Sequence, residues 1–276
     1  MRRSGRFEDL LPRLLTALVV APIAISLLVA GGWGTVVLVA LLGALLALEW
    51  RSVTAHAGGS VTTADAPYAA AAVAAVAVSP VLGFEAGFAA LALGLGLGAV
   101  LDVGRGRGRQ ARWALGGIAF IGTAVIAFLW LRLTDPYGVL AIVWVVLVVI
   151  ATDVGGYFAG RLVGGPKLWP AVSPKKTWSG LCGAVALAAL TGLIFSWLTT
   201  GTFFEEVVTV SAAAALCAQA GDMAESAVKR RFGVKDSSGL LPGHGGALDR
   251  FDGLMAATLV VALVTLWRGQ TVFIWS

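Results

Sequence analysis

The sequence has 276 residues, of which 58% are hydrophobic and only 13% are charged, and its mean hydropathy is +0.89. This composition leaves too little polar surface to cover a water-soluble globule, so it excludes soluble enzymes and binding modules and predicts a chain embedded in lipid. The net charge of +5 does not indicate nucleic acid, because basic loops of a membrane protein stand beside anionic lipid head groups. We therefore expect membrane lipids, and no nucleic acid, as partners.

Apolar stretches of the length that a bilayer requires recur along the whole chain, with short polar interruptions. They predict an all-α polytopic integral membrane protein with about nine transmembrane helices. Several stretches are short, so we expect the helices to extend into the flanking loops. The stretches are approximately Leu14–Gly31, Thr35–Leu48, Tyr68–Leu82, Ala86–Leu101, Trp113–Leu131, Val139–Phe158, Gly180–Thr200, Val207–Ser226 and Leu254–Trp267.

The first half of the sequence, residues 1–136, is low in complexity and is assigned to transmembrane helices that pack against one another. Gly94 and Gly98 stand four residues apart, a spacing that predicts a close approach between two helices. The first stretch follows several arginines and imitates a secretory signal peptide, with Ala30 near a small-residue cleavage region. An uncleaved first span is favoured, because an amino terminus in the cytoplasm makes the later charges alternate correctly.

Lysine and arginine are distributed asymmetrically over the predicted loops, which tests the number of spans. With a cytoplasmic amino terminus, 18 of the 20 basic residues lie on the inside, Arg51 among them, and only Arg132 and Arg268 lie outside. The opposite orientation would invert this bias. The pattern predicts a multi-pass protein of the cell's inner or plasma membrane, with its amino terminus in the cytoplasm.

The second half, residues 137–276, differs because charged residues enter the ends of its spans, where ionisable groups are costly and often functional. One group is Asp153, and another is the loop that contains Lys175, Lys176 and Thr177. The third is the stretch 221–253. All three lie on the predicted inner side, so we expect a polar cavity in this half that faces the cytoplasm.

A glycine-rich order at 160–167 imitates the phosphate-binding loop of nucleotide hydrolases, but two residues exclude that interpretation. Pro166 interrupts the loop, and Leu168 stands where that loop requires Ser or Thr. The cysteines, Cys182 and Cys217, both fall inside predicted spans and indicate apolar packing, with no disulfide or metal framework.

The stretch 221–253 combines acids, bases and paired glycines. Asp222, Ser226 and Lys229 line one stripe of a helix. Asp249 and Asp252 share another helical face, and paired glycines before them let backbone approach an anion. Carboxylates together with substrate phosphates are how Mg²⁺ is usually held. The stretch therefore predicts magnesium-assisted phosphoryl or nucleotidyl transfer, although ion pairs that set topology are the alternative.

The same stretch resembles the signature of a known enzyme family. The order Ser226-x2-Lys229-Arg230-x4-Lys235-Asp236-x5-Pro242-x-His244-Gly245-Gly246-x2-Asp249-Arg250-x-Asp252 is similar to that of phosphatidate cytidylyltransferases, the CDP-diacylglycerol synthases. The segments 153–157 and 173–177 also resemble the family. The resemblance covers residues 150–255. Ser179 departs from it, since many relatives have Glu there, and we assign no role to this position.

The resemblance implies that CTP and phosphatidic acid react to give CDP-diacylglycerol and diphosphate, with Mg²⁺ held by Asp222 and Asp249. A second, monovalent ion such as K⁺ is implied by the resemblance alone, and a homodimer is left open. The predicted catalytic residues are Asp222, Asp249, Lys229 and Arg250. The predicted substrate contacts are Asp153, Lys175, Lys176, Thr177, Ser226, Arg230, Lys235, Asp236, His244, Gly245, Gly246 and Asp252.

Three other functions compete with this one. A CTP-dependent lipid-alcohol kinase would use similar equipment but would need a base to deprotonate a hydroxyl. A CDP-alcohol phosphotransferase is disfavoured because Asp252-Gly253 lacks the arginine of that family's pattern. A transporter is disfavoured because the acids gather at one membrane face rather than near the midplane.

Overall fold

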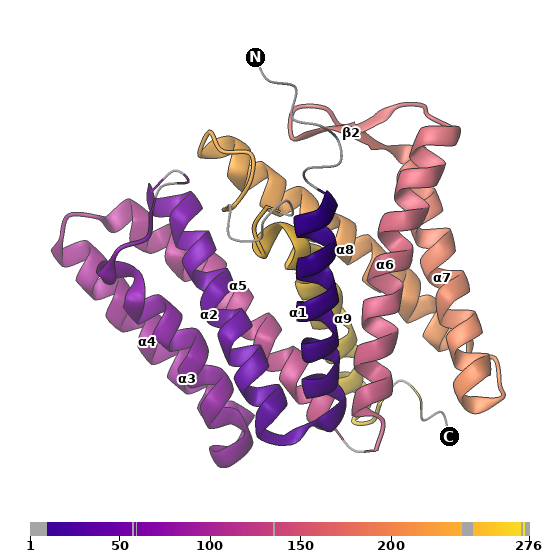
Figure 1. The fold of residues 1–276 in the computed structure, drawn as a ribbon, viewed down its shortest axis with the longest axis horizontal. Coiled ribbons are helices and arrows are strands. Elements are labelled where there is room, and N and C mark those ends of the chain that lie inside the picture. Colours follow the sequence, from indigo (N-terminus) through magenta and orange to yellow (C-terminus); the bar gives the residue numbers. More distant parts are fainter. Residues whose placement is uncertain are drawn as a thin grey trace. The chain divides into compact units, whose positions relative to one another are not determined.

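The computed structural model describes residues 10–56, 58, 60–134, 136–238, 245–271 and 273, and the side chains of Leu18 and of these residues from Ala21 onward except His56. Over these residues the chain forms nine long helices, a short 3-10 helix and one two-stranded hairpin (Figure 1). In chain order they are α1 (Leu10–Ala30), α2 (Gly32–His56), η1 (Thr63–Asp65), α3 (Ala66–Leu82), α4 (Phe84–Gly104), α5 (Gly108–Leu133), α6 (Gly138–Leu162), β1 (Lys167–Trp169), β2 (Ser173–Thr177), α7 (Trp178–Thr200), α8 (Glu205–Arg231) and α9 (Leu248–Arg268).

Each apolar stretch of the sequence corresponds to one of these helices, and most helices run past the ends of their stretch as expected. Among the described residues, the eight helices α2 to α9 are long and apolar enough to cross a membrane, and α1 contributes the shorter apolar stretch Ala21–Ala30. The prediction of an all-α, multi-pass membrane protein is confirmed. The cytoplasmic amino terminus stays a prediction.

Large apolar side chains face outward from these helices, as lipid contact requires. On α4, Leu93, Leu97 and Val100 are all exposed and are spaced by four and three residues, which places them on one face of the helix. Such a continuous apolar face is costly in water but favourable against lipid tails.

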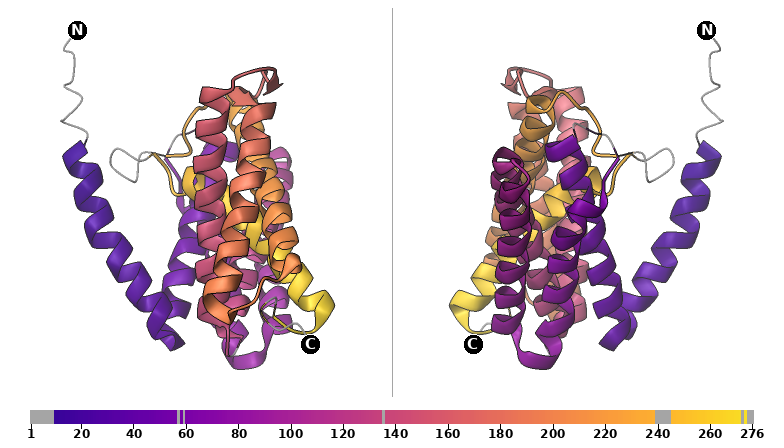
Figure 2. Two further views of the ribbon diagram at one scale, coloured as in Figure 1. Left: turned by 90° about the vertical axis from the view of Figure 1, so that its right-hand side faces the viewer. Right: turned by 90° about the vertical axis from the view of Figure 1, so that its left-hand side faces the viewer.

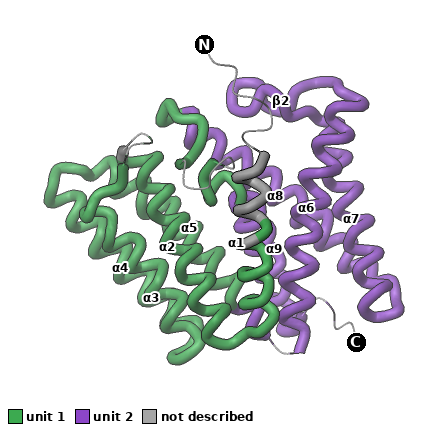
Figure 3. The backbone as a smooth tube through the Cα atoms, viewed as in Figure 1, with its two compact units in different colours: residues 1–129, 231–250 green, residues 130–230, 251–276 purple. Residues whose placement is uncertain are grey.

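The chain divides into two compact units (Figure 3). The first consists of residues 1–129 with 231–250, and the second of residues 130–230 with 251–276. Hydropathy alone does not indicate that a segment from the second half of the sequence belongs with the first helices. The predicted catalytic role of residues 137–276 stays a prediction.

The first unit is centred on α3 and α4, which lie side by side (Figures 1 and 2). A Cβ added at Gly94 would lie 2.4 Å from the Cβ of Ala71, and one added at Gly98 would lie 2.7 Å from the ring of Tyr68. Real Cβ atoms do not approach so closely, so only glycine permits this packing. The close helix approach predicted from Gly94 and Gly98 is confirmed.

A buried charged network ties several helices of this unit together. Arg51 lies inside α2 rather than in a loop, and its Nε donates to Asp65 Oδ1 at 2.7 Å. Its Nη2 lies 3.0 Å from Asp102 Oδ2, which also accepts from the Tyr68 hydroxyl at 2.9 Å. Arg107 Nη2 lies 2.8 Å from the other Asp102 oxygen. The side chains of Arg51, Asp65 and Asp102 are fully buried, so each charge depends on its partners.

We expect Arg51→Ala to destabilise the protein strongly, because buried Asp65 loses its ion pair with Arg51 and buried Asp102 loses one of its two arginine partners. Removal of one partner from a buried ion pair costs about 3–5 kcal/mol. SDS titration of the purified protein in detergent micelles measures the change. Arg105→Ala is the matched control, since Arg105 is exposed. An equal stability of the two variants would contradict this role for Arg51.

In the second unit, an aromatic side chain connects α6 with α8 and with the end of the chain. Trp144 of α6 is fully buried, and its Nε1 donates to Ser211 Oγ of α8 at 3.0 Å. The ring of Phe273 packs edge-on against Trp144, with centroids 5.6 Å apart. These contacts join α6 and α8 near their amino-terminal ends, whereas the polar residues of the predicted site lie toward their carboxyl-terminal ends.

Candidate functional site

The polar end of the second unit is shaped by glycines that let α6 and α7 approach closely. A Cβ at Gly155 would lie 2.4 Å from the carbonyl oxygen of Gly183, and one at Gly183 would lie 2.2 Å from the Cβ of Ala159. Figure 2 shows the two helices side by side over their length. Because small residues allow backbones to touch, the two helices act as one rigid wall of the site.

We expect Gly155→Ala to destabilise the second unit, since the new methyl group meets backbone atoms that have no rotamer to change. Overpacking of this kind costs about 1–3 kcal/mol. Gly116→Ala is the control, because a Cβ there meets nothing within 4 Å. The measurement is the midpoint of thermal unfolding in detergent, and an unchanged midpoint for Gly155→Ala would refute the tight packing.

The connection between α6 and α7 is a hairpin that the sequence did not indicate. Strands β1 and β2 pair in antiparallel fashion, with Lys167 opposite Thr177 and Trp169 opposite Ser173. Thr177 then caps α7, since its Oγ1 accepts a hydrogen bond from Gly180 N at 3.1 Å. The hairpin thereby fixes Lys175 and Lys176 one turn before the start of a helix.

Ser179, the departure from the family pattern, takes part in the same cap. Its hydroxyl lies 3.0 Å from Thr177 Oγ1 and donates to the carbonyl oxygen of Gly164. Within this structure Ser179 therefore links the start of α7 to the loop after α6.

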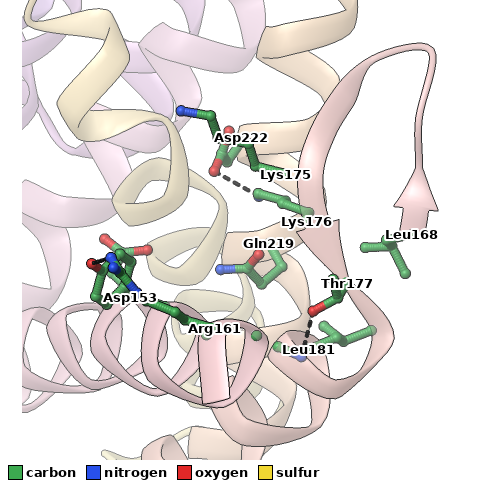
Figure 4. Close-up of a pocket in the computed structure, with 13 residues that line it drawn as sticks. Asp153, Arg161, Leu168, Lys175, Lys176, Thr177, Leu181, Gln219 and Asp222 are labelled. Carbon is green, nitrogen blue, oxygen red and sulfur yellow. Dashed lines mark hydrogen bonds and ion pairs between the residues drawn. The ribbon is translucent and has the colours of Figure 1, made fainter. Parts of the chain in front are cut away.

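A polar cavity of about 520 Å³ opens at this end of the unit (Figure 4). Helices α6, α7 and α8 and both strands of the hairpin contribute to its wall. Its charged residues are three cations and two carboxylates, namely Arg161, Lys175, Lys176, Asp153 and Asp222. Such a mixture suits a ligand that carries several negative charges together with a metal ion.

Asp222 and Lys176 form the central ion pair of the cavity. Lys176 points from β2 toward Asp222 of α8, and its Nζ lies 2.6 Å from Oδ2 (Figure 4). The other carboxylate oxygen accepts a longer hydrogen bond from Ser226 Oγ, at 3.3 Å. The side chain of Asp222 is 36% exposed, so its carboxylate can reach a ligand, whereas Lys176 is 20% exposed and its Nζ is buried in the contact with Asp222.

Asp252 lies beside Asp222 because α8 and α9 pack closely at a glycine. A Cβ at Gly221 would lie 2.9 Å from the carbonyl oxygen of Asp252 and 2.8 Å from the Cβ of Ala256. The two carboxylates repel one another electrostatically, and Lys176 and Lys229 offset part of that repulsion. Adjacent carboxylates of this kind favour a divalent cation.

Lys229 is placed differently from the solvent-facing bases around it. Its Nζ lies 2.5 Å from Glu225 Oε2, one turn earlier on α8, and the two side chains are only 11% and 6% exposed. Lys229 therefore neutralises a buried acid, and its predicted contact with a phosphate stays untested. Arg230, the next residue, is exposed.

The remaining predicted residues belong to the first unit. Asp249 accepts hydrogen bonds from Ser237 N at 3.1 Å and from Gly246 N at 3.0 Å, both to Oδ2. Gly245 has a positive φ of 80°, which favours glycine. These contacts fold residues 237–238 and 245–249 onto the start of α9.

The predicted site residues thus fall into three sets. Five of them line the cavity, namely Asp153, Lys175, Lys176, Thr177 and Asp222. Four others also belong to the second unit, namely Ser226, Lys229, Arg230 and Asp252. The first unit contains Lys235, Asp236, Gly245, Gly246, Asp249 and Arg250. His244 lies outside the described residues.

Three polar side chains of the cavity are absent from the predicted site residues. Tyr157 and Arg161 lie one and two turns after Asp153 on α6, and Arg161 Nη1 donates to the Tyr157 hydroxyl at 2.7 Å. Gln219 lies one turn before Asp222 on α8. Extending each helical stripe from its acid, by two turns along α6 and by one turn back along α8, would have found all three.

Comparisons with known proteins identify related sequences. The model of a family described as "Cytidylyltransferase family" matches residues 11–267. A phosphatidate cytidylyltransferase of Brucella suis biovar 1 (strain 1330) is 44% identical over 151 residues, which are 55% of this chain and 56% of that protein. The phosphatidate cytidylyltransferase of Bacillus subtilis (strain 168) is 38% identical over 137 residues, 49% of this chain and 51% of that protein. The matched region thus spans about half the length of these relatives.

Proposed function

The chain belongs to the cytidylyltransferase family, and from this premise we propose that it transfers the cytidylyl group of CTP to phosphatidic acid. The products are CDP-diacylglycerol, an intermediate of phospholipid synthesis, and diphosphate. The observation that carries the proposal is the cavity of the second unit, in which three cations stand beside Asp153 and Asp222. The name of the relatives, phosphatidate cytidylyltransferase, agrees with a site of this charge.

The reaction joins two polyanions and needs little acid–base help. An oxygen of the phosphatidate phosphomonoester attacks the α-phosphorus of CTP and forms the new P–O bond. The bond from the α-phosphorus to the oxygen that bridges to the β-phosphorus breaks, and its electron pair leaves with diphosphate. A phosphomonoester has a second pKa of about 6, so the nucleophile is mostly a dianion at neutral pH. The main task of the protein is therefore to reduce charge repulsion.

The cations of the cavity are suited to that task. Arg161 offers a planar fork of donors for bidentate phosphate contacts, whereas Lys175 and Lys176 offer movable point charges. In our proposal these three residues contact the triphosphate and stabilise the charge that develops on the departing diphosphate. Lys176 would exchange its partner Asp222 for a phosphate as the metal arrives.

We assign the magnesium ion to Asp222 and Asp249. Exposure of the Asp222 carboxylate and its repulsion by Asp252 fit a site that takes a cation together with substrate phosphates. The assignment of Asp249 rests on the family resemblance, since the two residues belong to different units. When bound, the ion would polarise the α-phosphate and orient it. The second, monovalent ion stays a prediction from the resemblance.

We further propose that the cavity faces the cytoplasm from the inner or plasma membrane of the cell. The charge bias of the loops supports this orientation. It also fits the substrates, because phosphatidic acid diffuses within the bilayer while CTP arrives from the aqueous side.

The test uses membranes that contain the protein, phosphatidic acid, Mg²⁺ and CTP labelled at one phosphorus. We expect label at the α-phosphorus to enter the lipid fraction and label at the γ-phosphorus to appear in diphosphate. Lipid labelled only from the γ-position would instead establish a kinase. Uptake of a solute into liposomes without consumption of CTP would indicate a transporter.

A further inference from the structure

A buried carboxylate of the first unit lies among donors that come from the far end of the sequence. Glu49 of α2 is 1% exposed. Its Oε2 accepts from Leu248 N at 2.6 Å and from Ser237 Oγ at 3.2 Å. Its Oε1 accepts from Ser238 Oγ at 2.6 Å and from Ala247 N at 3.0 Å. Neither the proposed reaction nor the family resemblance assigns a role to this residue.

The four donors lie on both sides of one segment. Ser237 and Ser238 precede residues 239–244, and Ala247 and Leu248 follow them at the start of α9. The amides at a helix start have no partner within the helix, and a negative charge there is favourable. The residues on both sides of the segment therefore donate hydrogen bonds to one buried carboxylate, that of Glu49.

We call the four hydrogen bonds to Glu49 the clamp, and Asp249 takes part in it through Ser237. Ser237 donates its hydroxyl to Glu49 and its amide to Asp249, so one residue connects the two carboxylates. The fit is tight, because a Cβ at Gly246 would lie 1.8 Å from Ser237 Oγ and 2.9 Å from a Glu49 oxygen. Loss of the Glu49 charge would weaken the contacts of the Ser237 and Ser238 hydroxyls and of the Ala247 and Leu248 amides together.

We propose that Glu49 is a positioning residue, which holds residues 237–238 and 247–248 in the conformation that presents Asp249 to the reaction. This inference rests on the proposed function for its catalytic consequence, but the clamp itself does not. A misplacement of about 1 Å at a reacting centre can cost about 100-fold in rate. The residue acts through Asp249 and does not need to touch either substrate.

The test compares Glu49→Gln with Glu85→Gln in the full-length protein in lipid nanodiscs. Glutamine keeps the length of the side chain but replaces one acceptor oxygen with a donor group. Glu85 is an exposed acid in the first turn of α4, in the same unit, and serves as the control. Hydrogen–deuterium exchange of peptides covering 236–251 reports the clamp, and steady-state transfer of α-labelled CTP reports its consequence.

For Glu49→Gln we expect faster exchange confined to that peptide and a fall of about 100-fold in kcat, with KM for CTP and for phosphatidate changed by less than about threefold. Glu85→Gln should change neither reading. Ser238→Ala, which removes one donor and keeps the charge, should shift both readings in the same direction by less. If Glu49→Gln does not fold, the two readings of Ser238→Ala test the proposal instead.

Unchanged exchange in residues 236–251 of both variants would overturn the clamp. Faster exchange with an unchanged kcat, or a loss expressed only in KM, would overturn its positioning role. If the unaltered protein transfers no α-label at all, the proposed function fails, while the exchange measurement still decides whether Glu49 holds the segment.

Discussion

Membranes containing the Asp222→Asn variant should lose CTP-dependent labelling of phosphatidate by at least about a thousandfold, since a metal ligand contributes several kcal/mol to transition-state stabilisation. Asparagine has the shape of aspartate but carries no charge. The substitution therefore removes the attraction for a cation and leaves Lys176 beside a neutral amide in place of its ion-pair partner. Both changes disturb the balance of charge that the cavity offers to a nucleotide.

The measurement is the initial rate of transfer from α-labelled CTP at matched amounts of protein in the membrane. Glu205→Gln is the control, because Glu205 is an exposed acid in the first turn of the same helix. We expect this control to retain full activity. An Asp222→Asn variant as active as the control would remove Asp222 from the metal site.

Much of the fold could be predicted because its signals are local in the sequence. A span is a run of apolar residues, and the close approach at Gly94 and Gly98 follows from their spacing on one helix. The polar end of the second unit was indicated in the same way, since Asp153 and Asp222 interrupt apolar stretches and Lys176 lies in the loop between two of them.

The remaining features depend on contacts between distant residues. Glu49 and Leu248 stand 199 positions apart, and nothing around Glu49 in the sequence marks it as a partner of the later segment. The positive-inside rule counts Arg51 as a basic residue of a cytoplasmic loop, yet its side chain is buried in a network with Asp65 and Asp102. A single sequence shows residue types and spacing but not which side chains meet, so these roles follow only from the three-dimensional structure.

The second large effect is expected for Asp249→Asn, which should also reduce transfer of α-labelled CTP by about a thousandfold if Asp249 is a metal ligand. A loss alone would not separate that role from a structural one, because Asp249 also accepts hydrogen bonds from Ser237 and Gly246. Both of these contacts reach Oδ2, and the carbonyl oxygen of asparagine can still accept them with its two lone pairs. Only the longer contact from Ser237 N to Oδ1, at 3.3 Å, is lost.

Hydrogen–deuterium exchange over residues 236–251 therefore distinguishes the two roles. If Asp249 contributes charge to a metal ion, Asp249→Asn should be inactive while exchange in this segment stays close to that of the unaltered protein. Glu49→Gln should show the opposite relation, with faster exchange and a smaller loss of rate, because it moves Asp249 without removing its charge. An Asp249→Asn variant that opens the segment as far as Glu49→Gln does would assign Asp249 to the clamp and leave Asp222, with Asp252 or Asp153, as carboxylates available to magnesium.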